Sequence, residues 1–365
     1  MRKLIIHVGP GKCGSSSIQE HFKSNERDYS LQSASFLQLN ANWIGKVSKI
    51  NDFPEERPET NRVKNRASSH QTLILSHEYL FQKPRAVSTI CKKLEQYFQE
   101  IIIIGYSRRQ SEHIKSSFNQ WIFRSRKRLL ESYNCLEEHG INPTLFTSLE
   151  RYLIAGALTD FRSTRQLSGD LILNWHKRYS RLDELIKNTN ATIKCGVIPI
   201  PKAASPNSLV KDFHLKADLQ PINSRKNQQE IQANPQFNQT LVEAVSNFQL
   251  LNEIKLVEPH KKNKELAAIS QALTTKSKNK TTFETRLEYY IDSFFWNSNK
   301  KFCEKYDLPT ASFEPREILT KSIIRHLIKT EQIKRQHDPE ILIETYQAMN
   351  AELAQACMEL IESKT

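Results

Sequence analysis

The chain has 365 residues and carries 53 Lys and Arg against 40 Asp and Glu, a net charge of +13. Hydrophobic residues make up 38% of it, and no apolar stretch approaches the roughly 20 residues that a membrane-spanning helix needs. The composition therefore excludes a membrane-spanning helix. The positive charge indicates an anionic partner, which could be a nucleotide, a nucleic acid, an acidic glycan or a membrane surface.

The N-terminus and the cysteines bear on the compartment. Only five mostly apolar residues separate Met1-Arg2-Lys3 from Gly9, too few for the core of a signal peptide. Six scattered cysteines, at positions 13, 91, 135, 195, 303 and 357, show no spacing typical of a zinc site or a disulfide framework. We therefore expect a cytoplasmic protein with free thiols.

Strand and helix patterns alternate through the N-terminal half. Strands are predicted at Lys3–Val8, Thr72–Ser76, Ile101–Tyr106 and Thr192–Ile198. Helices are predicted from Ser15 onward, over Val87–Phe98, over Ser111–Ser132 and around Trp175. This alternation indicates a parallel sheet with right-handed crossovers. The segment Asn51–Gln71, with two prolines and many charges, is predicted to be an exposed, mobile loop.

No segment beyond Pro221 matches these strands in strength. Helices are predicted at Asn238–Glu253, Glu284–Asn297 and Glu340–Glu362, and the Lys-rich stretch His260–Lys280 is expected to contain a loop. We therefore expect an α/β core over residues 1–225 and a helical C-terminal region over residues 226–365, which packs on the core and could complete an acceptor site.

A glycine-rich turn, GPGKCGSSSIQ at residues 9–19, follows the first strand and opens a helix. Such a turn directs backbone N–H groups and the positive end of the helix toward one point, a geometry that binds phosphate. Lys12 adds a positive charge, and the serine hydroxyls add donors. In a nucleoside-triphosphate loop, GxxxxGK[ST], the lysine follows the last glycine, whereas Lys12 precedes Gly14. The spacing of a Walker motif is therefore not met.

The turn instead resembles the 5′-phosphosulfate loop of the sulfotransferases that use 3′-phosphoadenosine 5′-phosphosulfate (PAPS). The common form of that loop is PK[ST]G[ST][ST]; Lys12, Gly14, Ser15 and Ser16 fall on the pattern, and Cys13 replaces the usual hydroxyl or small residue. Ser17 and the two residues after it are similar to the continuation in bacterial and carbohydrate-type members. The resemblance implies that residues 12–17 bind the donor.

Two arginines follow the strongest predicted strand, in IIIIGYSRRQSEHIKSSFNQ. Ligands bind at the carboxyl ends of strands in open α/β sheets, and the planar guanidinium suits phosphate oxygens. Arg108 and Ser116 resemble the arginine and serine that hold the 3′-phosphate of the donor in the same family, and the run SxFxQ that begins at Ser116 is similar to bacterial members. Arg109 with Ser117 has the same spacing but breaks that match, so we prefer Arg108 and Ser116.

Transfer of a sulfuryl group to a hydroxyl needs a general base, and the leaving phosphate needs a cation. Lys12 suits the second role. Ser76-His77-Glu78, directly after a predicted strand, resembles the SxE segment of glycan-type and many bacterial sulfotransferases, in which the glutamate is the base. His77 is the alternative base, because small-molecule members use a histidine and imidazole titrates near neutral pH. His7, within a strand, is interpreted as a core or edge residue.

Three basic segments have less specific interpretations. The cluster Arg124–Arg128 faces an acidic acceptor or is a solvated helix face. Asn223-Ser224-Arg225 is loosely similar to a polar segment near the nucleotide in the family. The lysines of His260–Lys280 are expected to aid solubility.

The resemblance covers roughly residues 1–225 and implies a P-loop-like, three-layer α/β fold around a central parallel sheet. It implies transfer of a sulfuryl group from PAPS to an acceptor hydroxyl, on a glycan or a small molecule, by a bacterial cytoplasmic enzyme. Neither strand end offers a Walker-B aspartate, so no metal is expected. A P-loop nucleotide kinase and a basic nucleic-acid-binding protein remain the alternatives; the misplaced lysine argues against the first, and the lack of a nucleic-acid reader motif against the second.

Overall fold

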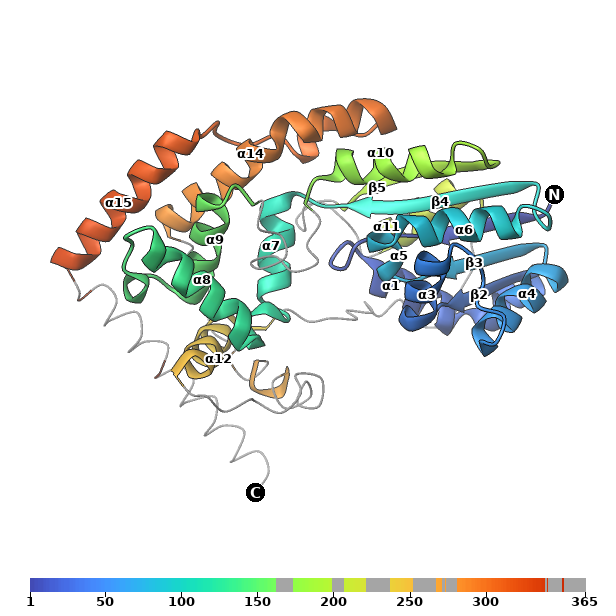
Figure 1. Cartoon of the computed structure of the whole chain (residues 1–365), viewed down its shortest axis with the longest axis horizontal. Helices are drawn as coiled ribbons and strands as arrows, with labels where there is room; N and C mark the ends of the chain where they lie inside the picture. The colour runs from blue at the N-terminus through green and yellow to red at the C-terminus, as the bar shows by residue number, and fades with distance from the viewer. Residues whose placement is uncertain are drawn as a thin grey trace, which may run out of the picture. The chain divides into compact units, whose positions relative to one another are not determined.

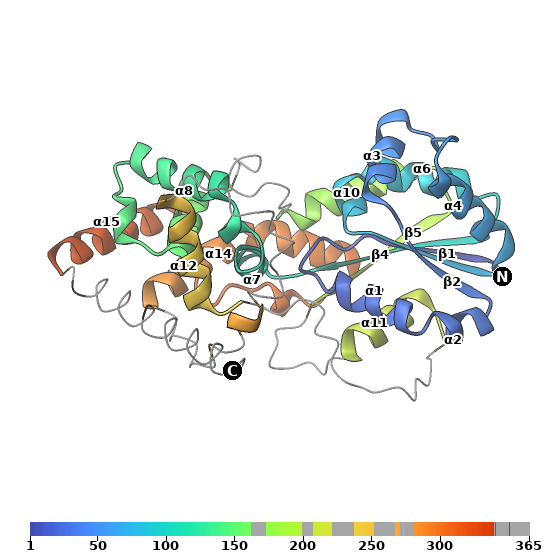
Figure 2. The same cartoon turned by 90° about the horizontal axis from the view of Figure 1, so that it is seen from below.

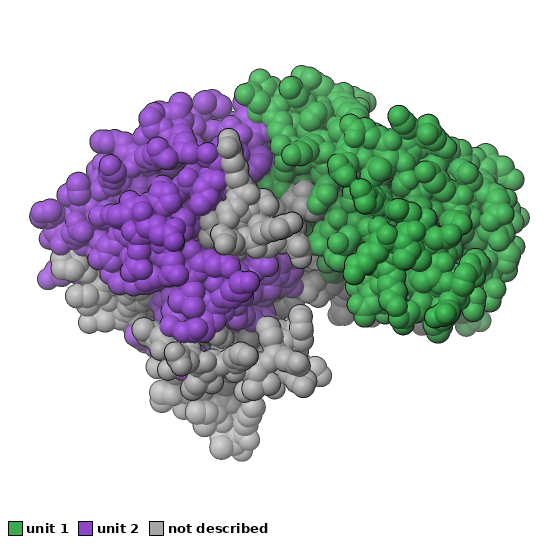
Figure 3. Space-filling model, in the orientation of Figure 1, with its two compact units in different colours: residues 1–109, 172–234, 297–313 green, residues 110–171, 235–296, 314–365 purple. Residues whose placement is uncertain are grey.

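The structure is a computed structural model that describes residues 1–161, 173–198, 207–220, 237–251, 267–270, 273, 281–338, 340 and 350 (Figure 1). The chain divides into two compact units that interleave along the sequence. Unit 1 comprises residues 1–109, 172–234 and 297–313, and unit 2 comprises residues 110–171, 235–296 and 314–365 (Figure 3). No helix in the described ranges is long and apolar enough to cross a membrane.

Unit 1 contains a five-stranded sheet in which every pair of neighbouring strands is parallel. Its strands are β1 (Lys3–His7), β2 (Ala34–Gln38), β3 (Thr72–Ser76), β4 (Glu100–Ser107) and β5 (Ala191–Val197). Their order is β2-β3-β1-β4-β5, and Ile5 of β1 lies opposite Ile74 of β3 and Ile102 of β4. Because β3 and β4 flank β1 on opposite sides, the chain changes direction across the sheet at β1. Open α/β sheets bind ligands at such a switch point, outside the carboxyl ends of the strands.

Helices cover both faces of this sheet (Figure 2). One layer contains α1 (Ser15–Ser24), α2 (Glu26–Leu31) and α11 (Asn207–Ala217), and the other contains α3 (Ala41–Ile50), α6 (Pro84–Leu94) and α10 (Trp175–Ile186). Side chains alternate between the faces of a strand, so Ile5 packs with Phe22 and Phe213 in the first layer, while Leu4 and Ile6, both fully buried, face the second. The expected three-layer α/β fold with a central parallel sheet is confirmed.

The predicted strands are all present, but two expectations are wrong. The segment expected to be a loop, Asn51–Gln71, contains the helix α4 (Pro58–Ser69). Proline is favourable in the first helical turn, and Val63 and Ala67, four residues apart, are fully buried. The second strand, β2, was not predicted at all. A further short helix, α5 (Tyr79–Gln82), follows β3.

The second wrong expectation is a single long helix over Ser111–Ser132. The structure has α7 (Gln110–Phe118), the 3₁₀ turn η1 (Ile122–Arg124) and α8 (Arg126–Glu138) instead. The break lets the adjacent side chains of Ile122 and Phe123 both be fully buried while Trp121 stays 41% exposed. A continuous helix would have pointed these three neighbours in directions 100° apart.

The remaining elements of unit 2 are also helical. They are η2 (Pro143–Leu145), α9 (Ser148–Leu158), α12 (Gln239–Leu251), α15 (Lys321–His337) and residues 282–296 of α14 (Thr282–Tyr306), whose other residues belong to unit 1 together with η3 (Thr310–Ser312). The helices expected at Asn238–Glu253 and Glu284–Asn297 correspond to α12 and α14. Three other segments lie wholly or mostly outside the described residues. They are the helix expected at Glu340–Glu362, the Lys-rich stretch His260–Lys280 and the polar segment Asn223-Ser224-Arg225.

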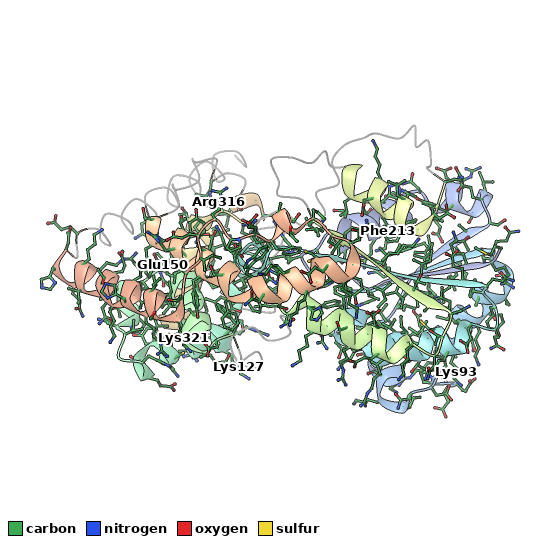
Figure 4. All side chains as sticks on the ribbon, turned by 90° about the horizontal axis from the view of Figure 1, so that it is seen from above. Lys93, Lys127, Glu150, Phe213, Arg316 and Lys321 are labelled. Atoms are coloured by element: carbon green, nitrogen blue, oxygen red, sulfur yellow. The ribbon has the colours of Figure 1, made fainter. Side chains whose placement is uncertain are left out.

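A buried ion pair joins α9 and α15 within unit 2. Arg335 donates to both carboxylate oxygens of Glu150, at 2.8 and 2.9 Å, and their side chains are 6% and 2% exposed. Glu150, labelled in Figure 4, also forms a capping box with Thr147 at the start of α9. Residues 110–171 thus group with C-terminal helices, whereas the expected division into a core over residues 1–225 and a helical region over residues 226–365 stays a prediction.

Candidate functional site

The residues expected to bind and activate a sulfate donor gather at one edge of the unit 1 sheet. The turn at residues 8–14 leaves the carboxyl end of β1, His77 and Glu78 follow β3, and Arg108 follows β4. These three strands are neighbours, with β1 between β3 and β4. The sheet therefore brings together segments that lie up to a hundred residues apart in the sequence.

The glycine-rich turn is held by backbone hydrogen bonds. The Val8 N–H donates to the Ile104 carbonyl of β4 at 2.9 Å, and the Cys13 N–H donates to the Pro10 carbonyl at 3.2 Å. Lys12 and Gly14 have positive φ angles of 69° and 78°. Positive φ is costly for a lysine, and such turns orient successive N–H groups toward an anion.

Gly14 must be a glycine for a second reason. A Cβ added there would lie 2.2 Å from Leu209 Cδ2 of α11, closer than two carbon atoms can approach. The helix α11 therefore packs directly on the turn, and this close approach fixes its conformation from outside the sheet. The glycine in the loop pattern thus has a packing role as well as a conformational one.

The three serines begin α1. Gly14 is the N-cap, and no side chain caps the helix, whose first turn holds no acidic residue. Ser15 is 1% exposed and donates to the Gly9 carbonyl over a long 3.3 Å, while Ser16 and Ser17 are half-buried. The start of α1 therefore presents the positive end of a helix dipole together with hydroxyl donors, which is a setting suited to an anion.

Cys13 contributes only its backbone to this turn. Its side chain is fully buried in the core beneath α1, and burial raises the pKa of the thiol far above its ordinary value, although Arg108 opposes the rise. The thiol therefore stays protonated and unreactive. A cysteine suits this position because its side chain faces apolar neighbours.

Lys12 and Glu78 are the central charged residues of the site. Glu78 is half-buried, and burial raises the pKa of its carboxyl while the nearby charge of Lys12 lowers it, with a net rise. A carboxylate with a raised pKa is a stronger base than an exposed one. The pair thus sets a cation and a base beside each other, one at the end of β1 and the other at the end of β3.

His77 is less suited to act as the base. Its Nδ1 accepts a hydrogen bond from the Tyr79 N–H at 2.9 Å, so the neutral ring carries its proton on Nε2. Burial lowers the pKa of His77, which keeps the ring neutral. Both ring nitrogens are then unable to take a proton readily, because one is occupied by the backbone and the other already bears hydrogen.

The two arginines after β4 differ in their partners. Arg109 donates to the carbonyls of Ser312 and Ala311 at 3.2 and 3.4 Å, which ties η3 to the sheet within unit 1. The carbonyl of Arg108 accepts the indole N–H of Trp175 at 2.9 Å, and its guanidinium acts on the Cys13 thiol in the turn. Arg109 thus holds η3 against the end of β4, and the preference for Arg108 as the phosphate-binding residue stays a prediction.

Ser116 belongs to the other unit. It lies on α7, is 5% exposed, and its neighbour Lys115 pairs with Glu284 and Glu288 at 3.3 and 2.9 Å. Its pairing with Arg108 at a 3′-phosphate stays a prediction.

In the basic cluster Arg124–Arg128, Lys127 is exposed, whereas Arg124 is half-buried over the rings of Phe123 and Phe237, at 5.0 and 4.6 Å. The cluster is therefore not uniformly solvated.

Sequence reasoning interpreted His7 as a core or edge residue, but it missed the polar contacts that His7 makes beneath the turn. His7 and Ser76, at the ends of β1 and β3, are fully buried and hydrogen-bonded to each other at 2.9 Å, and Gln19 of α1 donates to Ser76 at 3.1 Å. Two polar residues at the ends of otherwise apolar strands were the available signal. Burial lowers the pKa of His7 to about 3, so its ring is neutral.

Comparison with known proteins adds nothing to this geometry: no family model, no curated protein and no solved structure matches the chain. Within the described ranges, no group of three or more His, Cys, Asp or Glu side chains is arranged to hold a metal ion.

Proposed function

We propose that this protein is a sulfotransferase, which moves the sulfuryl group of PAPS to an acceptor hydroxyl. The observation that supports this most is that the charge of Lys12, in an anion-suited turn, acts on Glu78, a half-buried carboxylate whose pKa is raised. Sulfuryl transfer needs a cation at the leaving phosphate and a base at the attacking hydroxyl, and the ends of β1 and β3 offer one of each.

In the proposed reaction, Glu78 takes the proton of the acceptor hydroxyl as its oxygen attacks sulfur. The bond between sulfur and the bridging oxygen breaks, and that oxygen keeps the electron pair on the 5′-phosphate. Lys12 and the N–H groups at the start of α1 stabilise this charge. The products are a sulfate ester, adenosine 3′,5′-bisphosphate and a proton, which Glu78 holds and then releases to solvent.

Arg108 is proposed to bind the 3′-phosphate, and Ser116 is retained as its expected partner from the family resemblance. The acceptor is proposed to be a glycan or a small molecule. The net charge of +13 favours acidic members of both classes.

Thermal unfolding with three classes of ligand separates this proposal from its alternatives. Adenosine 3′,5′-bisphosphate at 100 times its dissociation constant should stabilise the protein by about 2.7 kcal/mol. ATP–Mg²⁺ and short oligonucleotides at the same concentrations should produce a smaller shift. A larger shift with ATP–Mg²⁺ would favour a kinase, and a larger shift with oligonucleotides would favour a nucleic-acid-binding protein; either result contradicts the proposal.

The acceptor class is then found with labelled donor. Wild type and Glu78→Gln are incubated with ³⁵S-labelled PAPS and a panel of glycans, lipids and phenols. Transfer by wild type to one class, with none by Glu78→Gln, is the expected result. Equal labelling by both proteins would show that Glu78 is not the base.

A further inference from the structure

A chain of hydrogen-bonded side chains crosses unit 1 directly beneath the glycine-rich turn. Gln38 of β2 donates to the Gln19 side-chain carbonyl at 3.2 Å, and the Gln19 amide donates to Ser76 Oγ at 3.1 Å. Ser76 Oγ lies 2.9 Å from His7 Nδ1. His7, Gln19 and Ser76 are buried, with exposures of 1%, 8% and 0%, so water does not replace these contacts.

The order of donors favours one tautomer of His7. Because Ser76 Oγ accepts from the Gln19 amide, its own O–H is available for His7 Nδ1. Nδ1 is then an acceptor, and the neutral ring carries its one hydrogen on Nε2. Every donor in the chain therefore points the same way, from Gln38 through Gln19 and Ser76 to His7.

The last donor of this chain and Ser15 both border Gly9. Among the described residues His7 Nε2 has no hydrogen-bond partner, although it is buried. A Cβ added to Gly9 would lie 3.0 Å from His7 Nε2 and 3.0 Å from Ser15 Oγ. The two atoms thus border the same small space, which glycine at position 9 leaves open. A buried N–H without an acceptor is unfavourable, so a nearby acceptor that becomes available should be used.

We propose that His7 is a positioning residue that holds Ser15 as a donor to the bound anion. In the structure, Ser15 donates to the Gly9 carbonyl at a long 3.3 Å and also lies 3.5 Å from the Pro10 carbonyl. With an anion in the turn, Ser15 turns its O–H to an anion oxygen and accepts the Nε2–H of His7 with its lone pair. This inference deepens the proposed function and rests on it, since the anion is the 5′-phosphosulfate of the donor.

The direction of the hydrogen bonds from Gln38 to His7 explains why this arrangement favours the binding of an anion. With the opposite tautomer, His7 Nε2 would present a lone pair and would itself accept the hydrogen bond from the Ser15 O–H. Ser15 would then turn its own lone pairs toward the turn and repel an anion. The rings of Tyr106 and Phe213 pack edge-on against His7, with centroids at 6.4 and 5.6 Å.

The test uses two substitutions that each keep one nitrogen of His7. In His7→Asn the short amide can still reach Ser76 but lacks the Nε2 donor; in His7→Gln the longer amide reaches the Nε2 position. Ser15→Ala and the double variant with His7→Asn complete the set. The dissociation constant of adenosine 3′,5′-bisphosphate is measured for each by calorimetry, and thermal unfolding shows that each variant folds.

His7→Asn should weaken bisphosphate binding about threefold to tenfold, the value of one hydrogen bond, and His7→Gln should restore most of it. In the Ser15→Ala background, His7→Asn should have no further effect, because its partner is gone. If the affinity losses of the two single variants multiply in the double variant, the proposal is overturned. Multiplying losses would mean that His7 does not act through Ser15.

A second readout separates this inference from the proposed function. Nitrogen-15 NMR of the ligand-free wild type should show the His7 ring neutral at pH 7, with its proton on Nε2. A proton on Nδ1 would overturn the inference whatever the protein binds. If wild type shows the Nε2–H form but does not bind the bisphosphate, the proposed function is wrong. The His7 and Ser15 variants are then titrated with sodium sulfate in the same calorimeter. If the two substitutions show no coupling in sulfate binding, the inference is overturned as well.

Discussion

Lys12 and Glu78 lie at the ends of adjacent parallel strands, and the charge of Lys12 opposes the rise that burial causes in the pKa of Glu78. In the proposed reaction the two residues have different tasks, one at the leaving oxygen and one at the attacking oxygen. Their substitutions should therefore have separable effects on turnover, on donor binding and on stability.

Glu78→Gln should lower turnover by about 10²- to 10⁴-fold, the usual contribution of a general base. Bisphosphate affinity should stay near that of wild type, because the base acts on the acceptor. Stopped-time assays with labelled PAPS and calorimetry measure the two quantities. His77→Asn, which can keep an acceptor for the Tyr79 N–H, is the control and should retain turnover. If His77→Asn is inactive and Glu78→Gln is active, the roles are reversed.

Glu78→Gln should also stabilise the ligand-free protein at pH values above 4.5, the ordinary pKa of a glutamate. The folded state holds the Glu78 proton more tightly than the unfolded state, so ionisation costs stability as pH rises through this range. The unfolding temperature of Glu78→Gln should exceed that of wild type at pH 7.5 and equal it near pH 3.5. A variant that is less stable at pH 7.5 would show that Glu78 has a structural partner instead.

Lys12→Met should reduce turnover by about 10²- to 10³-fold, with a smaller loss of donor affinity, because charge on the leaving oxygen is greatest in the transition state. Lys23→Met removes an exposed lysine from the end of α1 and is the charge-matched control. Steady-state kinetics should show unchanged kcat for Lys23→Met. Equal losses in both variants would mean that only general electrostatic attraction is involved.

Arg108→Ala should weaken bisphosphate binding about tenfold to a hundredfold, as expected for hydrogen bonds to a charged group. Binding of adenosine 5′-phosphate, which lacks the 3′-phosphate, should not change. Arg109→Ala is the matched control and should lower the unfolding temperature, since it removes the contacts to Ser312 and Ala311, without altering this selectivity. Loss of selectivity in Arg109→Ala alone would assign the 3′-phosphate to Arg109.

Arg335→Ala should destabilise the protein by about 3–5 kcal/mol, because it leaves the buried Glu150 carboxylate without its bidentate partner. Lys64→Ala removes an exposed pair with Glu55 and should change the stability very little, because exposed ion pairs are screened by solvent. Chemical denaturation followed by circular dichroism measures both changes. Similar small effects in the two variants would show that the Arg335 contact contributes little.

Much of the sheet could be predicted from the sequence, because runs such as IIIIGY are dense in β-branched residues and end at turn residues. The strand β2 has only Phe36 and Leu37 as large apolar residues, so its pattern was too weak to recognise. The helix α4 was missed because its few apolar residues, Val63 and Ala67, sit among charges. Local composition does not reveal that a neighbouring element will cover such a face.

The candidate site was predicted in part. The order of residues in the turn singled out Lys12, and position after a strand singled out Glu78 and Arg108. Their proximity depends on the strand order β2-β3-β1-β4-β5, which a sequence does not state. The series of hydrogen bonds that ends at His7 depends on side-chain contacts between four separate elements, and no local sequence pattern encodes these contacts.

The most direct measurement is calorimetric titration of the wild-type protein with adenosine 3′,5′-bisphosphate and, separately, with adenosine 5′-phosphate. The account predicts one site per chain for the bisphosphate and at least about tenfold weaker binding of the monophosphate, since one charged hydrogen-bonded group is missing. No binding of the bisphosphate, or equal affinity for the two nucleotides, would contradict the account.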